Sequence, residues 1–279
     1  MSLETCPVTE AFAAEIGGVD LSSPLSAEDE AAIKAAFWRY AVLIFPDQDL
    51  SPQQHIDFSK KFGPVETDRV LDQKVTPHRL DQSFADISNL KADGSIWERD
   101  SRQRMYKAGN KLWHTDSSFK FRPGLASLLY SRTVAPVGGH TEFADQRAAY
   151  DALPDAIKQG LHGLVAEHSI ATSRRKSGFA EFNEDEHRRL PPVPQVLVRT
   201  LPETGRKSLY VASHAGRRLR CVSGVLRWPS IAHASHRRCG RIQCAPGATT
   251  PDLLAPGCAV QPGRRAPPAS PPLGRCRPC

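Results

Sequence analysis

The sequence predicts a mainly β domain with flanking helices, of the β-sandwich or jelly-roll class. Short strand-like runs bounded by glycine and proline outnumber helical runs in the first 215 residues. The strands do not alternate regularly with helices, which argues against a doubly wound parallel sheet. The 279 residues can bury one large core, and 40% hydrophobic and 24% charged residues are typical of a globular protein.

Three helices carry recognisable signals. Ser26 is suited to cap a helix whose first turn is acidic, because carboxylates there favour the helix dipole. Ser51 and the proline after it open a second helix, which we expect to continue to about Phe62. Apolar residues at helical spacing predict a third helix from about Gln146 to Leu164.

The strands are predicted from β-branched and apolar runs between turn residues. The segment 12–21 has the composition of short strands and turns. Further strands are expected at Ala41–Phe45, Ala85–Asn89, Lys111–His114, Ala126–Val134, Thr141–Ala144, Gln195–Thr200 and Ser208–Ala212.

The composition changes abruptly near Gly216. From Arg217 to Cys279 there are eleven Arg, no Lys and one acid, Asp252, so the rest of the chain holds 37 − 11 = 26 basic and 30 − 1 = 29 acidic residues. The net charge of +7 therefore comes from this tail, and the body is slightly acidic. Six of the seven cysteines also lie in the tail.

We expect the tail, residues 216–279, to be disordered, because proline and glycine interrupt it and no hydrophobic period is visible. A zinc site is disfavoured because no Cys-x-x-Cys pair exists. A nucleic-acid-binding arm is disfavoured because lysines and interleaved aromatic residues are missing. With no apolar run of 18 residues and no secretory signal at the N-terminus, we expect no membrane partner and a cytoplasmic location.

The richest segment for chemistry is Leu112-Trp-His-Thr-Asp-Ser-Ser-Phe119. On a strand, His114 and Asp116 point to the same face, so an imidazole nitrogen and a carboxylate oxygen can reach one metal ion. Two His and one carboxylate on one face of an octahedron leave three positions open, the arrangement of ferrous oxygenases. Alone, His-x-Asp is a weak signal, and local hydrogen bonds at a strand edge explain it equally well.

A second segment, Pro136-Val-Gly-Gly-His-Thr-Glu-Phe143, places two glycines before Thr141. Glycine lets the backbone approach a ligand closely, and the threonine hydroxyl can bind a carboxylate. A glycine turn that leads into a strand is the simpler interpretation of this segment by itself.

Together, the body of the chain resembles the family of taurine and 2,4-dichlorophenoxyacetate dioxygenases, closer to the phenoxyacetate branch. The segments that carry the resemblance follow the family's order over about three quarters of the chain. They are Val19–Leu21, Ala41–Phe45, Phe62–Pro64, Asp86–Asn89, Leu112–Phe119, Gly138–Phe143, Arg147–Pro154, Glu167–Ser169, Leu197–Thr200, Gly205–Tyr210 and Ser213–Gly216.

The resemblance implies a double-stranded β-helix (jelly roll), with Fe(II) held by His114 and Asp116 and 2-oxoglutarate bound through Thr141. The implied reaction uses O2 to convert 2-oxoglutarate to succinate and CO2 and to hydroxylate a C–H bond of a small anionic substrate, phenoxyalkanoate-like or sulfonate-like. Asn89 and His214 fall in segments that face the substrate in this family. His168 also lies in a matching segment. For both His214 and His168, a structural role is at least as well supported as a substrate contact. The resemblance allows a homo-oligomer and implies no nucleic-acid partner.

The resemblance stops after Gly216, so residues 1–215 are expected to form an incomplete dioxygenase domain. The family's distal His and its 2-oxoglutarate-binding Arg have no counterparts, since neither His233 nor His236 is followed by the family pattern. Leu201 also departs from a histidine common in the phenoxyacetate branch. We hypothesise that the coding frame is disrupted after Gly216. The alternative function is a catalytically defective remnant of the family.

Overall fold

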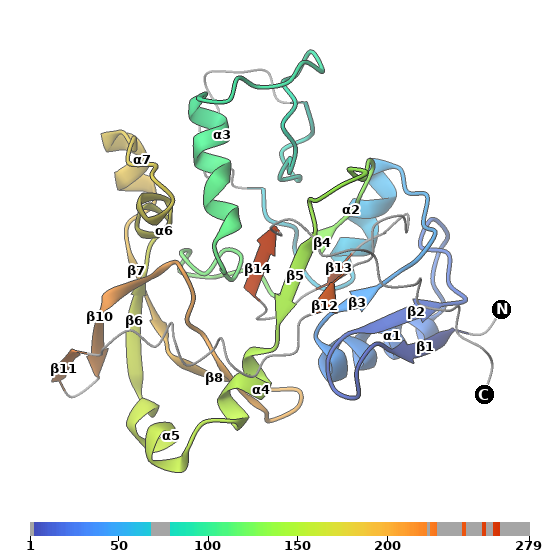
Figure 1. The fold of residues 1–279 in the computed structure, drawn as a ribbon. Coiled ribbons are helices and arrows are strands. Elements are labelled where there is room, and N and C mark those ends of the chain that lie inside the picture. The colour runs from blue at the N-terminus through green and yellow to red at the C-terminus, as the bar shows by residue number, and fades with distance from the viewer. Residues whose placement is uncertain are drawn as a thin grey trace.

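The computed structural model describes residues 3–67 and 79–221, and four further strands, Gly224–Arg227, Ile242–Gln243, Leu253–Leu254 and Ala259–Pro262. These segments combine helices with small sheets (Figure 1). Figure 1 shows the N-terminal elements on one side, a separate group of strands and helices on the other, and β5 between them. None of the helices in this described part has both the length and the apolar character needed to span a bilayer.

The N-terminal region packs a long helix on a sheet. Strand β1 (Glu4–Pro7) pairs antiparallel with β2 (Ala14–Gly17), and β2 pairs parallel with β3 (Leu43–Ile44). Helix α1 (Ala27–Tyr40) lies against β2 and β3. The described sheet continues through β13 (Leu253–Leu254) to β4 (Leu128–Leu129). Its core is apolar and includes Ile16, Phe37 and Phe45, which are fully buried.

Both predicted N-terminal helices are confirmed at their starts. The Ser26 side chain accepts a hydrogen bond from the Asp29 amide at the N-terminus of α1. Ser51 and Gln54 form a capping box at α2 (Pro52–Lys60), which satisfies two backbone amides that a helix otherwise leaves unpaired. The predicted strand Ala41–Phe45 is shortened to β3, because Ala41 has a positive φ of 67° where α1 ends.

The central strand β5 occupies Thr141–Ala144, as predicted, and pairs antiparallel with β12 (Ile242–Gln243) and β14 (Ala259–Pro262). Asp145 then caps α4 (Gln146–Asp151) by accepting a hydrogen bond from the Arg147 amide. The single helix predicted over residues 146–164 is wrong. Pro154 separates α4 from α5 (Asp155–Leu161), because proline has no amide hydrogen to continue the helical ladder.

The second large sheet contains β11, β10, β6 and β7 in that order. Its members are β6 (Leu164–His168), β7 (Val193–Val196), β10 (Ala215–Cys221) and β11 (Gly224–Arg227), and the described pairings between them are antiparallel. The strand predicted over residues 195–200 divides, because Val198–Thr200 (β8) pairs instead with Lys207–Leu209 (β9). The residues between β8 and β9 therefore form the turn of a β-hairpin.

Two further strand predictions are wrong. Residues 85–89 form a loop in which Asp86 accepts from Arg79 at 2.9 Å and Ile87 is largely exposed, so no apolar face is available for a sheet. In the predicted strand 111–114, Lys111 instead ends the helical segment η1 (Ala108–Lys111), and residues 112–114 belong to none of the named strands. The strand predicted over residues 126–134 is reduced to the two residues of β4.

Three short helices were not predicted. They are α3 (Arg102–Lys107), α6 (Ile170–Lys176) and α7 (Glu184–Arg189). Each begins with a capping Ser or Asn, but none is long enough to show a clear apolar period. Tertiary contacts hold them: the buried Glu186 of α7 accepts from Arg102 of α3 at 2.7 Å.

Candidate functional site

His114 follows the helical segment η1 closely in the chain, and a hydrogen bond to the backbone fixes its imidazole ring. The side chain is buried, and Nδ1 lies 2.7 Å from the carbonyl oxygen of Leu112. Because a carbonyl oxygen can only accept, Nδ1 carries the hydrogen and Nε2 is the nitrogen free to bind a metal. The backbone thus selects the tautomer that metal ligation requires.

Asp116 meets this nitrogen from a turn rather than from the predicted strand. Its Oδ1 lies 3.1 Å from Nε2 of His114, and its Oδ2 accepts from the Ser127 hydroxyl at 2.7 Å. Ser117, the next residue, has a positive φ of 54°, which turns the chain back. The Asp116 side chain is 47% exposed whereas that of His114 is 7% exposed, so the pair opens toward solvent on its carboxylate side.

The chemistry of these two side chains fits a divalent metal ion. With Nδ1 protonated, Nε2 and Oδ1 face each other with lone pairs, so a proton or a cation must lie between them. Nitrogen and oxygen ligands about 2.1 Å from a metal and at right angles to each other lie about 3.0 Å apart. The separation of 3.1 Å is therefore suited to adjacent positions on one ion.

The surroundings of Asp116 keep its carboxylate charged. Desolvation of the carboxylate raises its pKa, but the contact with the His114 ring and the hydrogen bond from the Ser127 hydroxyl outweigh that effect, so the pKa lies below its usual value. A metal ligand must be deprotonated, so this environment favours binding of a cation near neutral pH.

Gln195 of β7 holds the turn that carries Asp116. Its Nε2 donates to the carbonyl oxygens of Ser118 at 3.1 Å and Lys120 at 2.8 Å. Its Oε1 accepts from Arg199 at 2.6 Å. Side chains from β7 and β8 therefore position the turn that carries Asp116.

His214 lies beside the His114–Asp116 pair. The Ser213 amide donates to the carbonyl oxygen of Trp113 at 2.9 Å, which brings the two segments together. The His214 ring lies 5.8 Å from that of His114 and 5.0 Å from Phe119. Its Nδ1 is buried with no hydrogen-bond partner, and burial together with the charge of His114 holds its pKa well below the ordinary value. The structure thus brings this predicted residue to the site, in its neutral form.

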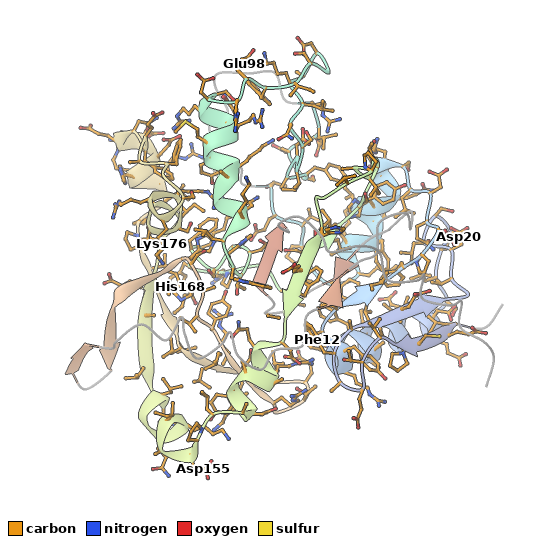
Figure 2. The ribbon with its side chains drawn as sticks, viewed as in Figure 1. Phe12, Asp20, Glu98, Asp155, His168 and Lys176 are labelled. Atoms are coloured by element: carbon orange, nitrogen blue, oxygen red, sulfur yellow. The ribbon has the colours of Figure 1, made fainter. Side chains whose placement is uncertain are left out.

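His168 occupies a more structural position, where β6 meets α6 (Figure 2). Its ring stacks on Tyr210 at 5.4 Å, and Nδ1 lies 3.1 Å from the Ser118 hydroxyl. Burial, followed by the charge of Arg199, lowers its pKa to about 4. This histidine therefore supports the Asp116 turn from behind as a neutral ring.

The remaining predicted residues are not joined to the pair by any contact of the described residues. Thr141 begins β5, opposite Pro262 of β14, and β14 also lies against η1. Asn89 is exposed in a loop, where its carbonyl oxygen accepts from the Trp97 amide at 2.8 Å. The roles assigned to Thr141 and Asn89 stay predictions.

Within residues 3–67 and 79–216, no three His, Cys, Asp or Glu side chains are grouped closely enough to hold a metal ion. In this part of the chain, His114 and Asp116 are therefore a pair of candidate ligands without a third. His233 and His236, considered for the third position, lie outside the described residues. Arg174, which sequence reasoning did not single out, is buried close to this region.

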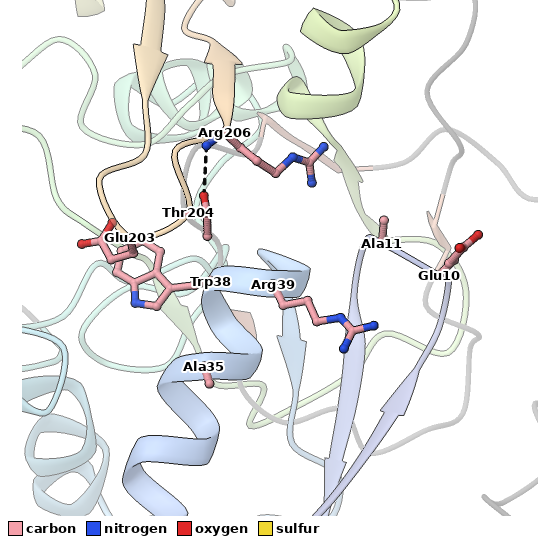
Figure 3. Close-up of a pocket in the computed structure, with 8 residues that line it drawn as sticks. All are labelled: Glu10, Ala11, Ala35, Trp38, Arg39, Glu203, Thr204 and Arg206. Atoms are coloured by element: carbon pink, nitrogen blue, oxygen red, sulfur yellow. Dashed lines mark hydrogen bonds between the residues drawn. The ribbon is translucent and has the colours of Figure 1, made fainter.

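A hollow on the molecular surface lies elsewhere, between α1, the β1–β2 turn and the β8–β9 hairpin (Figure 3). It is lined by Glu10, Ala11, Ala35, Trp38, Arg39, Glu203, Thr204 and Arg206. None of the predicted site residues contributes to it, and its charges of both signs indicate no ligand class.

Known proteins are similar to this chain in both sequence and structure. The chain is 38% identical over 216 residues to an alpha-ketoglutarate-dependent 2,4-dichlorophenoxyacetate dioxygenase of Cupriavidus pinatubonensis, covering 77% of this chain and 75% of that protein. It is 36% identical over 222 residues to an (S)-phenoxypropionate/alpha-ketoglutarate-dioxygenase of Sphingobium herbicidovorans, covering 77% and 72%. The crystal structure of AAD-2 in complex with Mn(II) and N-oxalylglycine superposes with a TM-score of 0.80 at 34% identity, covering 95% of this chain and 92% of that one.

The family described as "Taurine catabolism dioxygenase TauD, TfdA family" matches residues 4–224. The match includes both candidate ligands and ends close to the change in composition near Gly216. With the two relatives above, it confirms the resemblance to the phenoxyacetate branch. The chain belongs to the TauD/TfdA family of alpha-ketoglutarate-dependent dioxygenases.

Proposed function

We propose that this protein is an Fe(II)- and 2-oxoglutarate-dependent dioxygenase that hydroxylates a small anionic substrate, phenoxyalkanoate-like or sulfonate-like, with release of succinate and CO2. The observation that carries the proposal is the 3.1 Å approach of His114 Nε2 to Asp116 Oδ1, with the opposite ring nitrogen bound to a carbonyl oxygen. Family membership supplies the reaction class.

The chain's own groups have distinct tasks in this proposal. His114 presents the Nε2 lone pair, since the Leu112 carbonyl oxygen holds its other nitrogen. Ser127 holds one carboxylate oxygen of Asp116, which leaves the other for the metal. When bound, iron supplies the redox chemistry with O2 and 2-oxoglutarate, and the protein orients both substrates.

Thr141 is the residue that we assign to a carboxylate of 2-oxoglutarate. It begins a strand that pairs with β14, and β14 lies against the segment that leads to His114. We further propose that the small sheets form parts of a double-stranded β-helix, since the superposed AAD-2 structure covers nearly the whole chain. Asn89 and His214 are assigned to the side of the site that faces the organic substrate, and the adjacency of His214 to His114 supports its assignment.

The phenoxyacetate branch is the better-supported substrate class. The two relatives described above are named for phenoxyacetate and phenoxypropionate substrates, and the chain is more than one third identical to each. Phe119, close to His214, offers an apolar ring near the candidate ligands. A flat aromatic substrate with one carboxylate would match this combination of apolar and polar groups.

The decisive experiment measures succinate formed from 2-oxoglutarate by the full chain with Fe(II), ascorbate and a panel of phenoxyalkanoates and alkylsulfonates. We expect substrate-dependent succinate formation that is lost in His114→Ala. The control His162→Ala, which replaces an exposed histidine, should keep it. The defective remnant considered from the sequence is not favoured by these relatives. If the wild-type chain formed no succinate with any substrate, the enzymatic proposal would be wrong.

The division into a domain of residues 1–215 and a tail of residues 216–279 stays a prediction, because most of the tail lies outside the described residues. The family match extends to residue 224 and no further. Sequencing the gene tests the proposed frame disruption. A shifted frame that encodes the family's distal His and Arg after Gly216 would support it, and no such frame would refute it.

A further inference from the structure

Arg174 is a buried cation with unused hydrogen-bond donors. It lies on α6 and is 5% exposed. Its Nη2 donates to Asn110 Oδ1 at 2.8 Å, whereas Nε and Nη1 are buried and have no hydrogen-bond partner. Among the described residues, no carboxylate lies within ion-pair distance of this guanidinium. A buried guanidinium with two unpaired donor atoms and no ion pair among these residues is costly unless a ligand completes its contacts.

The guanidinium is held in place by its neighbours from two other helical segments. Its Cζ lies 4.4 Å from the centre of the Tyr106 ring, close enough for a cation–π interaction. Gly109 lies directly against it, since a Cβ built at Gly109 would overlap the Arg174 side chain at Nη1 and Cδ. Asn110 fixes the third side. An arginine ordered in advance loses little entropy when it binds a planar anion.

The helix that carries Arg174 and one of the segments that contact it both connect directly to the candidate metal site. The helix η1 contacts α6 and ends at Lys111, three residues before His114. The helix α6 starts next to His214, because the Ser169 amide donates to the His214 carbonyl oxygen at 2.9 Å. Arg174 is therefore connected through η1 to His114 and through α6 to His214.

From this placement we infer that Arg174 is a binding residue for a carboxylate group at the His114–Asp116 site. The inference rests on the proposed function, in which both the co-substrate and a phenoxyalkanoate carry carboxylates. A guanidinium is suited to this group because its planar N–H donors match carboxylate oxygens. A purely structural arginine would need only the Tyr106 and Asn110 contacts, and these leave two donor atoms unused.

The experiment compares carboxylate binding by the wild-type full chain, Arg174→Met and Arg174→Lys. The matched control is Arg175→Met, which removes the adjacent and exposed arginine of the same helix. Calorimetry with Mn(II) under anaerobic conditions follows two probes separately, 2-oxoglutarate and 2,4-dichlorophenoxyacetate. The neutral methyl ester of the second probe reports contacts that do not involve its carboxylate.

We expect Arg174→Met to weaken binding of one carboxylate probe at least about tenfold, since charge-assisted hydrogen bonds are lost. The lysine variant should recover part of that affinity, and the control should bind as the wild type does. If the phenoxyacetate weakens but its ester does not, Arg174 binds the organic substrate. If 2-oxoglutarate weakens instead, Arg174 binds the co-substrate. Equal affinities for both probes in Arg174→Met and wild type would overturn the inference, as would a wild type that binds neither.

A second variant covers the case in which Arg174→Met does not fold. Gly109→Ala keeps the guanidinium but displaces it, because the added methyl group overlaps its position. We expect it to weaken the same carboxylate probe with unchanged binding of the ester, and unchanged binding of the carboxylate would count against the inference. Succinate formation by the wild type is measured in parallel. If the wild type forms succinate but the variants bind both carboxylates normally, only the inference about Arg174 fails. If the wild type forms no succinate, the proposed function fails.

Discussion

Arg147 and Asp145 form a buried ion pair across a single residue of the chain. Nε and Nη2 of Arg147 donate to the two carboxylate oxygens of Asp145, each at 2.9 Å. The same guanidinium also donates to the carbonyl oxygens of Ala11, Trp38 and Arg39. It therefore satisfies backbone groups at the end of α1 and ties β5 and α4 to the N-terminal region.

We predict that Arg147→Met lowers the free energy of unfolding by about 3–5 kcal/mol, because it removes the ion-pair partner of a buried carboxylate and the side-chain donor to three carbonyl oxygens. The control is Arg188→Met, whose side chain is 77% exposed and should contribute less than about 1 kcal/mol. Urea unfolding of both variants measures the difference. Equal stability of the two variants would contradict the structural role of Arg147.

The candidate metal ligands give a second prediction. His114→Ala should abolish tight Mn(II) binding, since it removes the only ring nitrogen that faces Asp116 Oδ1 within the described residues. Titration calorimetry of the full chain measures the affinity, and thermal unfolding shows whether the variant is folded. His162→Ala, at an exposed position, should bind Mn(II) as the wild type does. Undiminished binding by folded His114→Ala would remove His114 from the site.

Ser127 provides a third prediction, because its hydroxyl donates to Asp116 Oδ2 at 2.7 Å and lowers the pKa of that carboxyl. Ser127→Ala should weaken Mn(II) binding about tenfold, as is usual for a lost hydrogen bond to a metal ligand. The pKa of Asp116 rises without this bond, so Mn(II) binding should fail at a higher pH than in the wild type. Ser95→Ala removes a comparable serine–aspartate hydrogen bond, from Ser95 to Asp93, on an exposed loop. A pH series that is the same for both variants would refute the prediction.

The buried histidines predict how stability depends on pH. The pKa of His168 falls from 6.5 to about 4 on folding, so below pH 6.5 the unfolded chain takes up a proton that the folded chain refuses. Stability should therefore decrease between pH 7.5 and pH 5.5, by about 1 kcal/mol from His168. His168→Gln should reduce this dependence, whereas His162→Gln should not. Urea unfolding at the two pH values measures it, and a slope unchanged in His168→Gln would show that this ring is not responsible.

The sequence was most informative where local chemistry decides the structure. Ser26 and Ser51 cap helices because their side chains accept hydrogen bonds from amides three residues away. The strand at Thr141–Ala144 follows a glycine turn that leads into it. Pro154 could have indicated the break between α4 and α5, since a proline rarely continues a helix, but the apolar spacing on both sides concealed it.

The sequence singled out the His114–Asp116 pair, but not its geometry, whereas the roles of Thr141 and Asn89 stay predictions. The spacing of His114 and Asp116 indicated a shared metal through a strand, whereas a turn with a positive φ at Ser117 brings the two together. Arg174 could not be predicted, because its burial depends on Gly109 and Tyr106, more than sixty positions earlier in the chain. Short sequence windows contain no signal for such a long-range contact.

The acceptor that orients His114 is a main-chain oxygen, and this choice has an evolutionary consequence. The side chain at position 112 can vary without removing the hydrogen bond to Nδ1, because every amino acid supplies the same carbonyl group. The tautomer is thus robust to point mutation at its nearest partner. It is sensitive instead to insertions or deletions between residues 112 and 114, which would move the carbonyl away from the ring while both candidate ligands remain encoded.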